Sequence, residues 1–315
     1  MPARIVLLVT SPRLPAGLLT AEAWDVVRAH PVLAAGESDL TTALRSVGAD
    51  VTIVAPTADR VLETAREHDT TVWLSGPAGD ADLARELGLR LAREPQLAEL
   101  ELMYGSWDPP GARLLDAVAV MDRLYSPGGD PWKRQQTHES LARFLLEECY
   151  EAYDAIEAGD LSALREELGD VLLQVVLHAR LAEDLPEDER WSVDDVAAGL
   201  VDKMVRRNPH VFAGETVGSV DEIVTNWEQI KRAEKARDSA LDGIALSQPA
   251  LALAATFLRK ARRAGIDVPL PDGDDLGVRL LRAVAGTDED AEAALRRAAL
   301  AYAEAVRTAE RGAGS

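Results

Sequence analysis

Acidic side chains recur at spacings of three and four residues in two neighbouring stretches of the chain. Glu147, Glu148 and Glu151 form the first group, and Glu167 and Asp170 form the second. Residues three or four apart lie on one face of an α-helix. Carboxylates gathered from two helices repel one another unless cations are bound, and an all-oxygen site suits Mg²⁺. Two such ions close together can bind a phosphate and activate a water molecule, so the pattern indicates phosphoanhydride chemistry.

The apolar residues around these acids argue against a purely solvated acidic surface. When residues 141–156 are wound as a helix, Glu148 falls inside the apolar arc, between Phe144 and Ala152. The next helix is apolar around most of its circumference, which predicts that it is buried. One narrow polar stripe crosses it, and carboxylates there are costly unless a cation meets them. The stripe consists of Glu167, Asp170, Gln174 and His178.

The simpler alternative is that these acids are solvated. Glutamate pairs are common on helices rich in alanine and leucine, and most of them face water. We apply that interpretation to Asp154, Glu157 and Glu166. For His178, two roles remain open: it could orient a carboxylate, or it could be a core histidine.

The two acidic motifs resemble the signature of the MazG family of nucleotide pyrophosphohydrolases, EExxE followed by ExxD on the next helix. The resemblance covers about residues 114–235. Three further stretches match the family: Gln136-Thr137-His138, Arg206-Arg207-Asn208-Pro209-His210-Val211-Phe212 and Asn226-Trp227-Glu228-Gln229-Ile230-Lys231.

This resemblance implies an all-α fold that dimerises into a helical bundle. It also implies hydrolysis of nucleoside triphosphates to nucleoside monophosphate and pyrophosphate with Mg²⁺, for which Mn²⁺ could substitute. The metal ligands would be Glu147, Glu148, Glu151, Glu167 and Asp170. Of these, Glu148 or Glu151 would also help to deprotonate the attacking water.

The resemblance further places substrate-binding residues at Lys203, Arg207, Trp227 and Lys231, near the phosphates and the base. Lys203 and Arg207 lie four residues apart and share a helix face. The alternative is that Arg207 and Lys231, like Arg206, are ordinary cations on a helix surface. Trp132 could stack on a base, or it could serve as a core or lid residue. The family has an acid two residues after the proline of this loop, where this chain has Lys133.

The whole chain divides into three predicted domains. Residues 1–110 alternate strand and helix signals, which predicts a small α/β domain. Residues 111–237 would be the MazG catalytic helices, and residues 238–315 a helical tail resembling a degenerate second MazG repeat. We expect strands at 5–9, 51–54, 71–74 and 97–103. We expect helices at 21–29, 42–47, 59–68, 82–93, 112–124, 137–158, 161–183, 193–207, 220–237, 249–265 and 275–311.

The α/β domain weakly resembles a shortened tetrapyrrole methylase. The glycine-rich loop expected after its first strand is replaced by the sequence from Thr10 to Pro15. That sequence would not let a cofactor approach the backbone as glycines do. We therefore expect a non-catalytic domain that binds no S-adenosylmethionine.

Composition limits the partners and the compartment. Of 315 residues, 47% are hydrophobic and 4% aromatic, which suits packed helices, and the net charge is −20. Such a surface would repel a nucleic-acid duplex. One cysteine, Cys149, excludes an intramolecular disulfide and suits a reducing cytosol. Apolar runs are too short for a signal peptide or a membrane span, so we expect a cytoplasmic protein.

The sequence thus predicts a mainly α protein: a dimeric MazG-type helical bundle with a small degenerate α/β N-terminal domain. We expect an enzyme whose substrates are nucleoside triphosphates, with damaged nucleotides and a house-cleaning role as one possibility. The alternative is a regulatory nucleotide-binding protein that keeps its metal site and acts through a partner.

Overall fold

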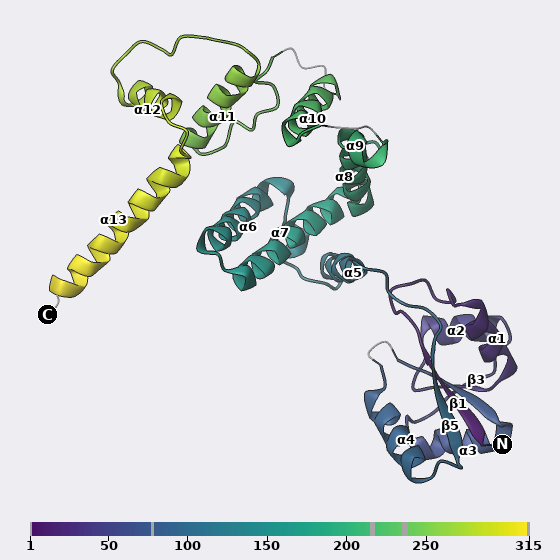
Figure 1. Cartoon of the computed structure of the whole chain (residues 1–315). Coiled ribbons are helices and arrows are strands. Elements are labelled where there is room, and N and C mark those ends of the chain that lie inside the picture. Colours follow the sequence, from purple (N-terminus) through teal and green to yellow (C-terminus); the bar gives the residue numbers. More distant parts are fainter. Residues whose placement is uncertain (1, 77–78, 215–217, 235–238, 314–315) are drawn as a thin grey trace. The chain divides into compact units, whose positions relative to one another are not determined.

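The computed structural model describes residues 2–76, 79–214, 218–234 and 239–313 (Figure 1). Contacts group the chain into two compact units, Met1–Ala197 and Ala198–Ser315, and each is described by itself. In the described parts of the chain, no helix is both long and apolar enough to cross a membrane.

The N-terminal part of the first unit is built on a five-stranded parallel sheet with the order β3-β2-β4-β1-β5. The strands are β1 (Ala3–Val9), β2 (Val32–Ala34), β3 (Val51–Ile53), β4 (Thr70–Leu74) and β5 (Ala98–Tyr104). Successive residues of a strand point to opposite faces. Val6 and Leu8 of β1 therefore pack into one core, while Ile5 and Leu7 pack into another.

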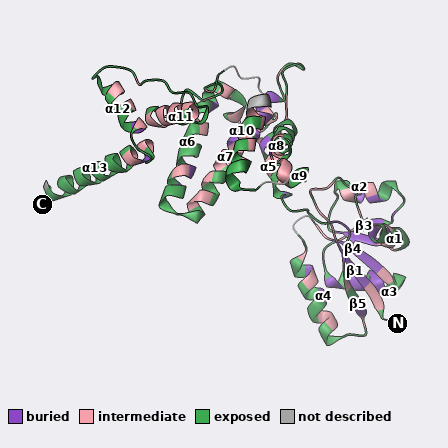
Figure 2. Ribbon diagram, turned by 45° about the horizontal axis from the view of Figure 1, so that its top comes forward, coloured by how far each residue is buried: buried purple, intermediate pink, exposed green. Residues whose placement is uncertain are grey.

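Helices cover both faces of this sheet. Val27 of α1 (Ala21–Ala29) and Leu44 of α2 (Asp39–Ser46) join the core on the face of Val6 and Leu8. The helices α3 (Ala58–His68) and α4 (Ala81–Arg93) supply Val61 and Leu87 to the opposite core. Figure 2 shows buried residues concentrated in the strands between these helices. The predicted α/β layer is therefore present, with a core on each face.

The rest of the first unit is helical and contains both acidic motifs. It comprises α5 (Arg113–Tyr125), the short 3₁₀-helix η1 (Lys133–Gln135), α6 (His138–Ala158), α7 (Leu161–Ala182) and the start of α8 (Val193–Arg207). Thr137 caps α6 as predicted, accepting a hydrogen bond from the Ser140 amide. Gly159 ends α6 in the left-handed conformation, and Asp160 caps α7. These signals reverse the chain within two residues, so α6 and α7 pack side by side.

The second unit contains the end of α8 and five further helices. They are α9 (Pro209–Phe212), α10 (Val220–Glu234), α11 (Ala250–Arg263), α12 (Leu276–Ala285) and α13 (Ala291–Ala313). Contacts of α11 with α12 and with α13 hold its C-terminal part together.

The predicted fold class is confirmed, and three elements differ from expectation. The strand β2 went unpredicted because it has only three residues after Pro31. The short helix α9 also went unpredicted. The single helix expected at 275–311 is two helices, because the chain breaks at Gly286 and Asp290 caps α13 through the Ala293 amide. Residues 235–237 of the helix predicted at 220–237 lie outside the described residues. The domain boundaries at 110 and 237 stay predictions.

The expectation that α7 is buried nearly all round is wrong for this chain taken alone. Leu177 is 1% exposed, whereas Leu168 is 53% and Val175 is 37% exposed. Leu168 and Val175 are seven residues apart and share the face opposite Leu177. The reason is that α5 and α6 cover only one side of α7.

Close backbone packing after α5 gives a test of this arrangement. The Asp130 amide donates to the Leu124 carbonyl, and a Cβ at Gly129 would lie 2.2 Å from that carbonyl oxygen. Gly129→Ala should therefore lower the free energy of unfolding by about 1–3 kcal/mol through overpacking. Urea unfolding followed by circular dichroism measures the change.

Gly88→Ala is the matched control for this prediction. Gly88 lies inside α4 with no atom within 4 Å of an added Cβ. Alanine there should raise the stability by about 0.5–1 kcal/mol. A Gly129→Ala protein that unfolds at the wild-type urea concentration would contradict the described turn.

Candidate active site

Three carboxylates converge between α6 and α7. Glu148 and Glu151 come from α6 and Glu167 comes from α7, and one oxygen of each lies within 4.8 Å of the others. Glu148 and Glu167 are half-buried, whereas Glu151 is exposed. The structure thus brings acids from both motifs together at the helix pair. We call Glu147, Glu148, Glu151, Glu167 and Asp170 the acidic cluster.

Electrostatic effects link Asp170 and Glu147 to these three. Burial raises the pKa of Glu148, and the charges of Asp170, Glu151 and Glu147 raise it further. Burial also raises the pKa of Glu167, followed by the charges of Glu151 and Asp170. Asp170 is half-buried and lies one turn after Glu167, while Glu147 is exposed at the margin.

The donor set fits a divalent cation of the Mg²⁺ or Mn²⁺ type. All of the converging donors are carboxylate oxygens, the ligands that hard cations prefer. The raised pKa values show that negative charge is already unfavourable here, and a bound cation would offset that repulsion. Glu148, Glu151 and Glu167 would hold the ion, with Asp170 beside them.

Gln174 is a buried neighbour of the acidic cluster to which the sequence assigned no role. It is 4% exposed, and its amide donates a hydrogen bond to Glu148 that lowers the pKa of this carboxyl. Among the described residues, its side-chain oxygen is buried without a hydrogen-bond partner. The contact places a buried amide beside Glu148, and the position of Gln174 four residues after Asp170 was the available signal.

His178, the last member of the polar stripe, contacts a second histidine. Its Nδ1 lies 2.7 Å from Nδ1 of His138, and the two rings stack at 5.0 Å with 4° between their planes. The Trp191 ring also stacks on His138, with ring centroids 6.2 Å apart. One ring must donate and the other accept, so the contact needs at least one neutral imidazole. The structure therefore supports the core role for His178 over the role of orienting a carboxylate.

Trp132 lies beside the start of α6, which is the helix that carries Glu148. It is 47% exposed, and its ring meets Phe144 edge-on at 5.9 Å. Lys133 lies over the same ring and pairs with Asp130. The loop therefore has an acid at Asp130, although the family position is occupied by Lys133. An exposed indole face remains available for stacking.

The substrate-binding residues predicted from the resemblance fall in the second unit. Arg207 is 9% exposed, and its guanidinium lies 5.5 Å from the Trp227 ring. Its Nη2 is 2.6 Å from Glu234, which also binds Arg206. The hydrogen bonds from Arg207 and Arg206 lower the pKa of Glu234 to about 2. Arg207 is thus a buried, paired cation and not an ordinary surface residue.

Lys203 and Lys231 have separate surroundings. Lys203 is half-buried one turn before Arg207 on α8. Lys231 lines a cavity of about 480 Å³ between α10 and α11, together with Lys260 and Arg263. The structure brings Arg207 and Trp227 together, and the role of all four residues in substrate binding stays a prediction.

The histidine pair predicts a pH-dependent stability. Burial and the neighbouring His138 lower the pKa of His178 below its unfolded value of about 6.5. The unfolded chain then binds more protons than the folded chain near that pH. His178 therefore contributes to the free energy of unfolding above about pH 6.5, and this contribution is lost as the pH falls below that value.

The urea concentration at which half of the protein is unfolded, measured at about pH 7.5 and about pH 5.5, reports this pH dependence of stability. His138→Gln should show a smaller loss than wild type, because a neutral partner removes the charge repulsion. His68→Gln, at an exposed site on α3, should behave as wild type. The carboxylates are unchanged in all three proteins, so equal pH dependence in the three would contradict the pairing.

In a comparison with known families, residues 136–212 match the MazG nucleotide pyrophosphohydrolase domain. This segment includes both acidic motifs and the histidine pair, and it ends at Phe212.

Three relatives extend the likeness. A protein of Streptomyces cacaoi, described as an uncharacterized 26.1 kDa protein in the blaB 3′ region, is 49% identical over 233 residues, 72% of this chain and 94% of its own. A nucleoside triphosphate pyrophosphohydrolase of Mycolicibacterium smegmatis is 47% identical over 250 residues, 77% of this chain and 70% of its own. The Escherichia coli K12 protein of the same name is 43% identical over 154 residues, 48% of this chain and 57% of its own. The first two alignments extend well beyond the matched domain.

Proposed function

The chain belongs to the MazG family of nucleotide pyrophosphohydrolases, and from this premise we propose that it hydrolyses nucleoside triphosphates to nucleoside monophosphate and pyrophosphate with bound Mg²⁺. The observation that carries the proposal is the convergence of Glu148, Glu151 and Glu167 within 4.8 Å. Such a set of oxygens is built for a hard divalent cation. Mn²⁺ has the same ligand preference and could substitute.

The reaction consumes one water molecule and breaks the anhydride between the α- and β-phosphates. A bound divalent cation would supply charge neutralisation for the phosphate oxygens and a lower pKa for water. Glu148, Glu151, Glu167, Asp170 and Glu147 would hold it. Glu148 or Glu151 would accept the proton of the attacking water, because a carboxylate near the reacting oxygen can act as a general base.

Gln174 keeps Glu148 in place for this role. Its amide donates to Glu148 from a position that is 4% exposed, which would favour one orientation of the carboxylate. Of the two candidates, Glu148 is thus the one held by a buried partner, while Glu151 is exposed to solvent.

The proposed substrate-binding residues offer the chemistry that a nucleotide needs. Lys203, Arg207 and Lys231 would address phosphate oxygens, since cations form strong charge-assisted hydrogen bonds with them. Trp227 and Trp132 would stack on the base. Damaged nucleoside triphosphates are candidate substrates, which would make the enzyme a house-cleaning one.

Pyrophosphate release from canonical and oxidised nucleoside triphosphates tests the proposal. With Mg²⁺ present, Glu148→Gln should lower the rate by at least about 100-fold. Mutation of residues that only support the metal ligands already lowers metal affinity or activity by about 10–100-fold. Glu157→Gln, an exposed substitution on the same helix, should keep wild-type activity.

Thermal unfolding without metal checks that the variant is folded. Glutamine removes one charge from a repelling cluster, so the melting temperature of Glu148→Gln should not fall below that of wild type. Activity that survives Glu148→Gln would refute the mechanism. A wild-type protein that binds nucleotides yet turns none over would favour the regulatory alternative.

We also propose that the catalytic helices form a homodimer. Leu168 and Val175 leave one face of α7 exposed, and Leu146 and Tyr150, one turn apart, leave an apolar face on α6. A second copy would remove these apolar surfaces from water, which is favourable at about 25 cal/mol per Å².

Sedimentation equilibrium tests the dimer. Wild type should show twice the chain mass, and Val175→Glu should shift it toward the monomer by placing a charge in the interface. Val47→Glu, at a site 47% exposed after α2, should leave the mass unchanged. A monomeric wild type would refute this assembly.

A further inference from the structure

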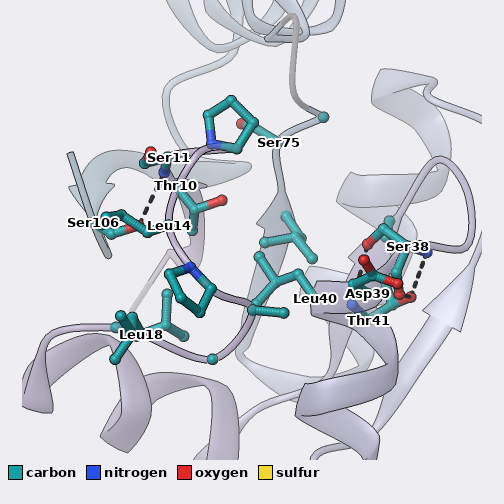
Figure 3. A pocket seen from close by; sticks show the side chains of 18 of the residues that line it. Thr10, Ser11, Leu14, Leu18, Ser38, Asp39, Leu40, Thr41, Ser75 and Ser106 are labelled. Carbon is teal, nitrogen blue, oxygen red and sulfur yellow. Dashed lines mark hydrogen bonds between the residues drawn. The ribbon is translucent and has the colours of Figure 1, made fainter. Parts of the chain in front are cut away.

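We propose that the α/β layer holds a second ligand site, for a nucleoside-sized heteroaromatic molecule that carries no phosphate. The site is a cavity of about 800 Å³ at the carboxyl ends of β1, β2, β4 and β5 (Figure 3). Pockets that bind small molecules measure about 300–1,000 Å³. The inference concerns only the α/β layer and is independent of the reaction proposed above.

The sheet topology explains why a cavity forms there. The chain leaves β1 toward α1 on one face of the sheet, and it leaves β4 toward α4 on the other face. Because β1 and β4 are neighbours, the loops that follow them separate and leave a crevice. Ligands of open parallel sheets bind at such switch points, beyond the carboxyl ends of the strands.

The walls of the cavity are mostly apolar. Leu14 and Leu18 come from the loop after β1, and Leu40 comes from α2 (Figure 3). The hydroxyls of Thr10 and Ser75 also line it, and among the described residues neither has a hydrogen-bond partner. Apolar walls with a few polar groups suit a heteroaromatic ring, which offers apolar faces and polar edges.

The charges of the lining argue against a phosphate. Among the described residues that line the cavity, Arg13 is the one cation, and two carboxylates already engage it. Its Nε and Nη2 donate to Asp116 at 2.8 and 2.6 Å, and its Nη1 donates to Asp108. A phosphate would therefore meet no available cation here.

The nearby start of α2 offers no substitute for that cation. Ser38 and Thr41 form a capping box in which each side chain accepts a hydrogen bond from the amide of the other residue. Asp39 places a negative charge at its first position. A nucleotide's phosphate would be repelled at this end of the cavity, whereas an uncharged nucleoside would not.

Isothermal titration calorimetry of the full chain with adenosine, guanosine, AMP and inorganic phosphate tests the site. For the binding that Leu18→Asp weakens, we expect at least one nucleoside to bind and the two phosphate compounds to bind at least about tenfold more weakly, a difference of 1.4 kcal/mol. Leu18→Asp should weaken nucleoside binding at least about tenfold by replacing part of the apolar wall with a charge.

Two controls separate this site from the acidic cluster and from unfolding. Leu18 is 56% exposed and Leu89, on α4 outside the cavity, is 57% exposed, so both aspartate variants should fold. Leu89→Asp should bind nucleosides as wild type does, and both variants should release pyrophosphate at the wild-type rate.

Four outcomes would overturn the site. They are binding of neither nucleoside, Leu18-dependent binding of AMP or phosphate as tight as that of the nucleosides, nucleoside binding that survives Leu18→Asp, and tighter binding of S-adenosylmethionine than of adenosine. The last result would identify a methylase-type cofactor site.

Discussion

Repulsion between the carboxylates of α6 and α7 is the constraint on which the catalytic helices depend. The cluster holds three carboxylate oxygens within 4.8 Å of one another, which is unfavourable without a cation. The helix pair resists this repulsion through its apolar core, where Leu141 and Leu177 are each 1% exposed. Gly159 and Asp160 fix the reversal between the helices. Hydrophobic burial thus holds the carboxylates close together in spite of their repulsion, and a bound cation would make this proximity favourable.

The polar stripe of α7 changes character along its length. At its beginning, Glu167 and Asp170 are half-buried and carry the repelling charges. One turn further, Gln174 is buried and uncharged, and it donates to Glu148. The stripe ends at His178, which stacks on His138 from the start of α6. The buried member of the stripe, Gln174, is therefore an uncharged one, which agrees with the cost of desolvating a charge.

The sequence predicted the features that depend on local spacing. The helices that carry the acidic cluster begin and end within a residue or so of expectation, because Thr137 and Gly159 are strong local signals. The contact between His138 and His178 could not be read, since it joins residues 40 apart through tertiary packing. The exposed side of α7 was also missed: an apolar circumference indicates burial, but it does not say whether the same chain or a second copy provides the cover.

Charge compensation in the second unit limits what its arginines would contribute to the proposed binding of a triphosphate. Arg207 is buried against Glu234, whose pKa of about 2 keeps it ionised at physiological pH. Much of the positive charge of Arg207 is therefore already balanced, and Arg206 shares the same carboxylate. In a protein with a net charge of −20, a triphosphate gains little from such cations alone. In the proposed function, Arg207 would orient a phosphate through its remaining N–H groups, and bound divalent cations would neutralise the triphosphate.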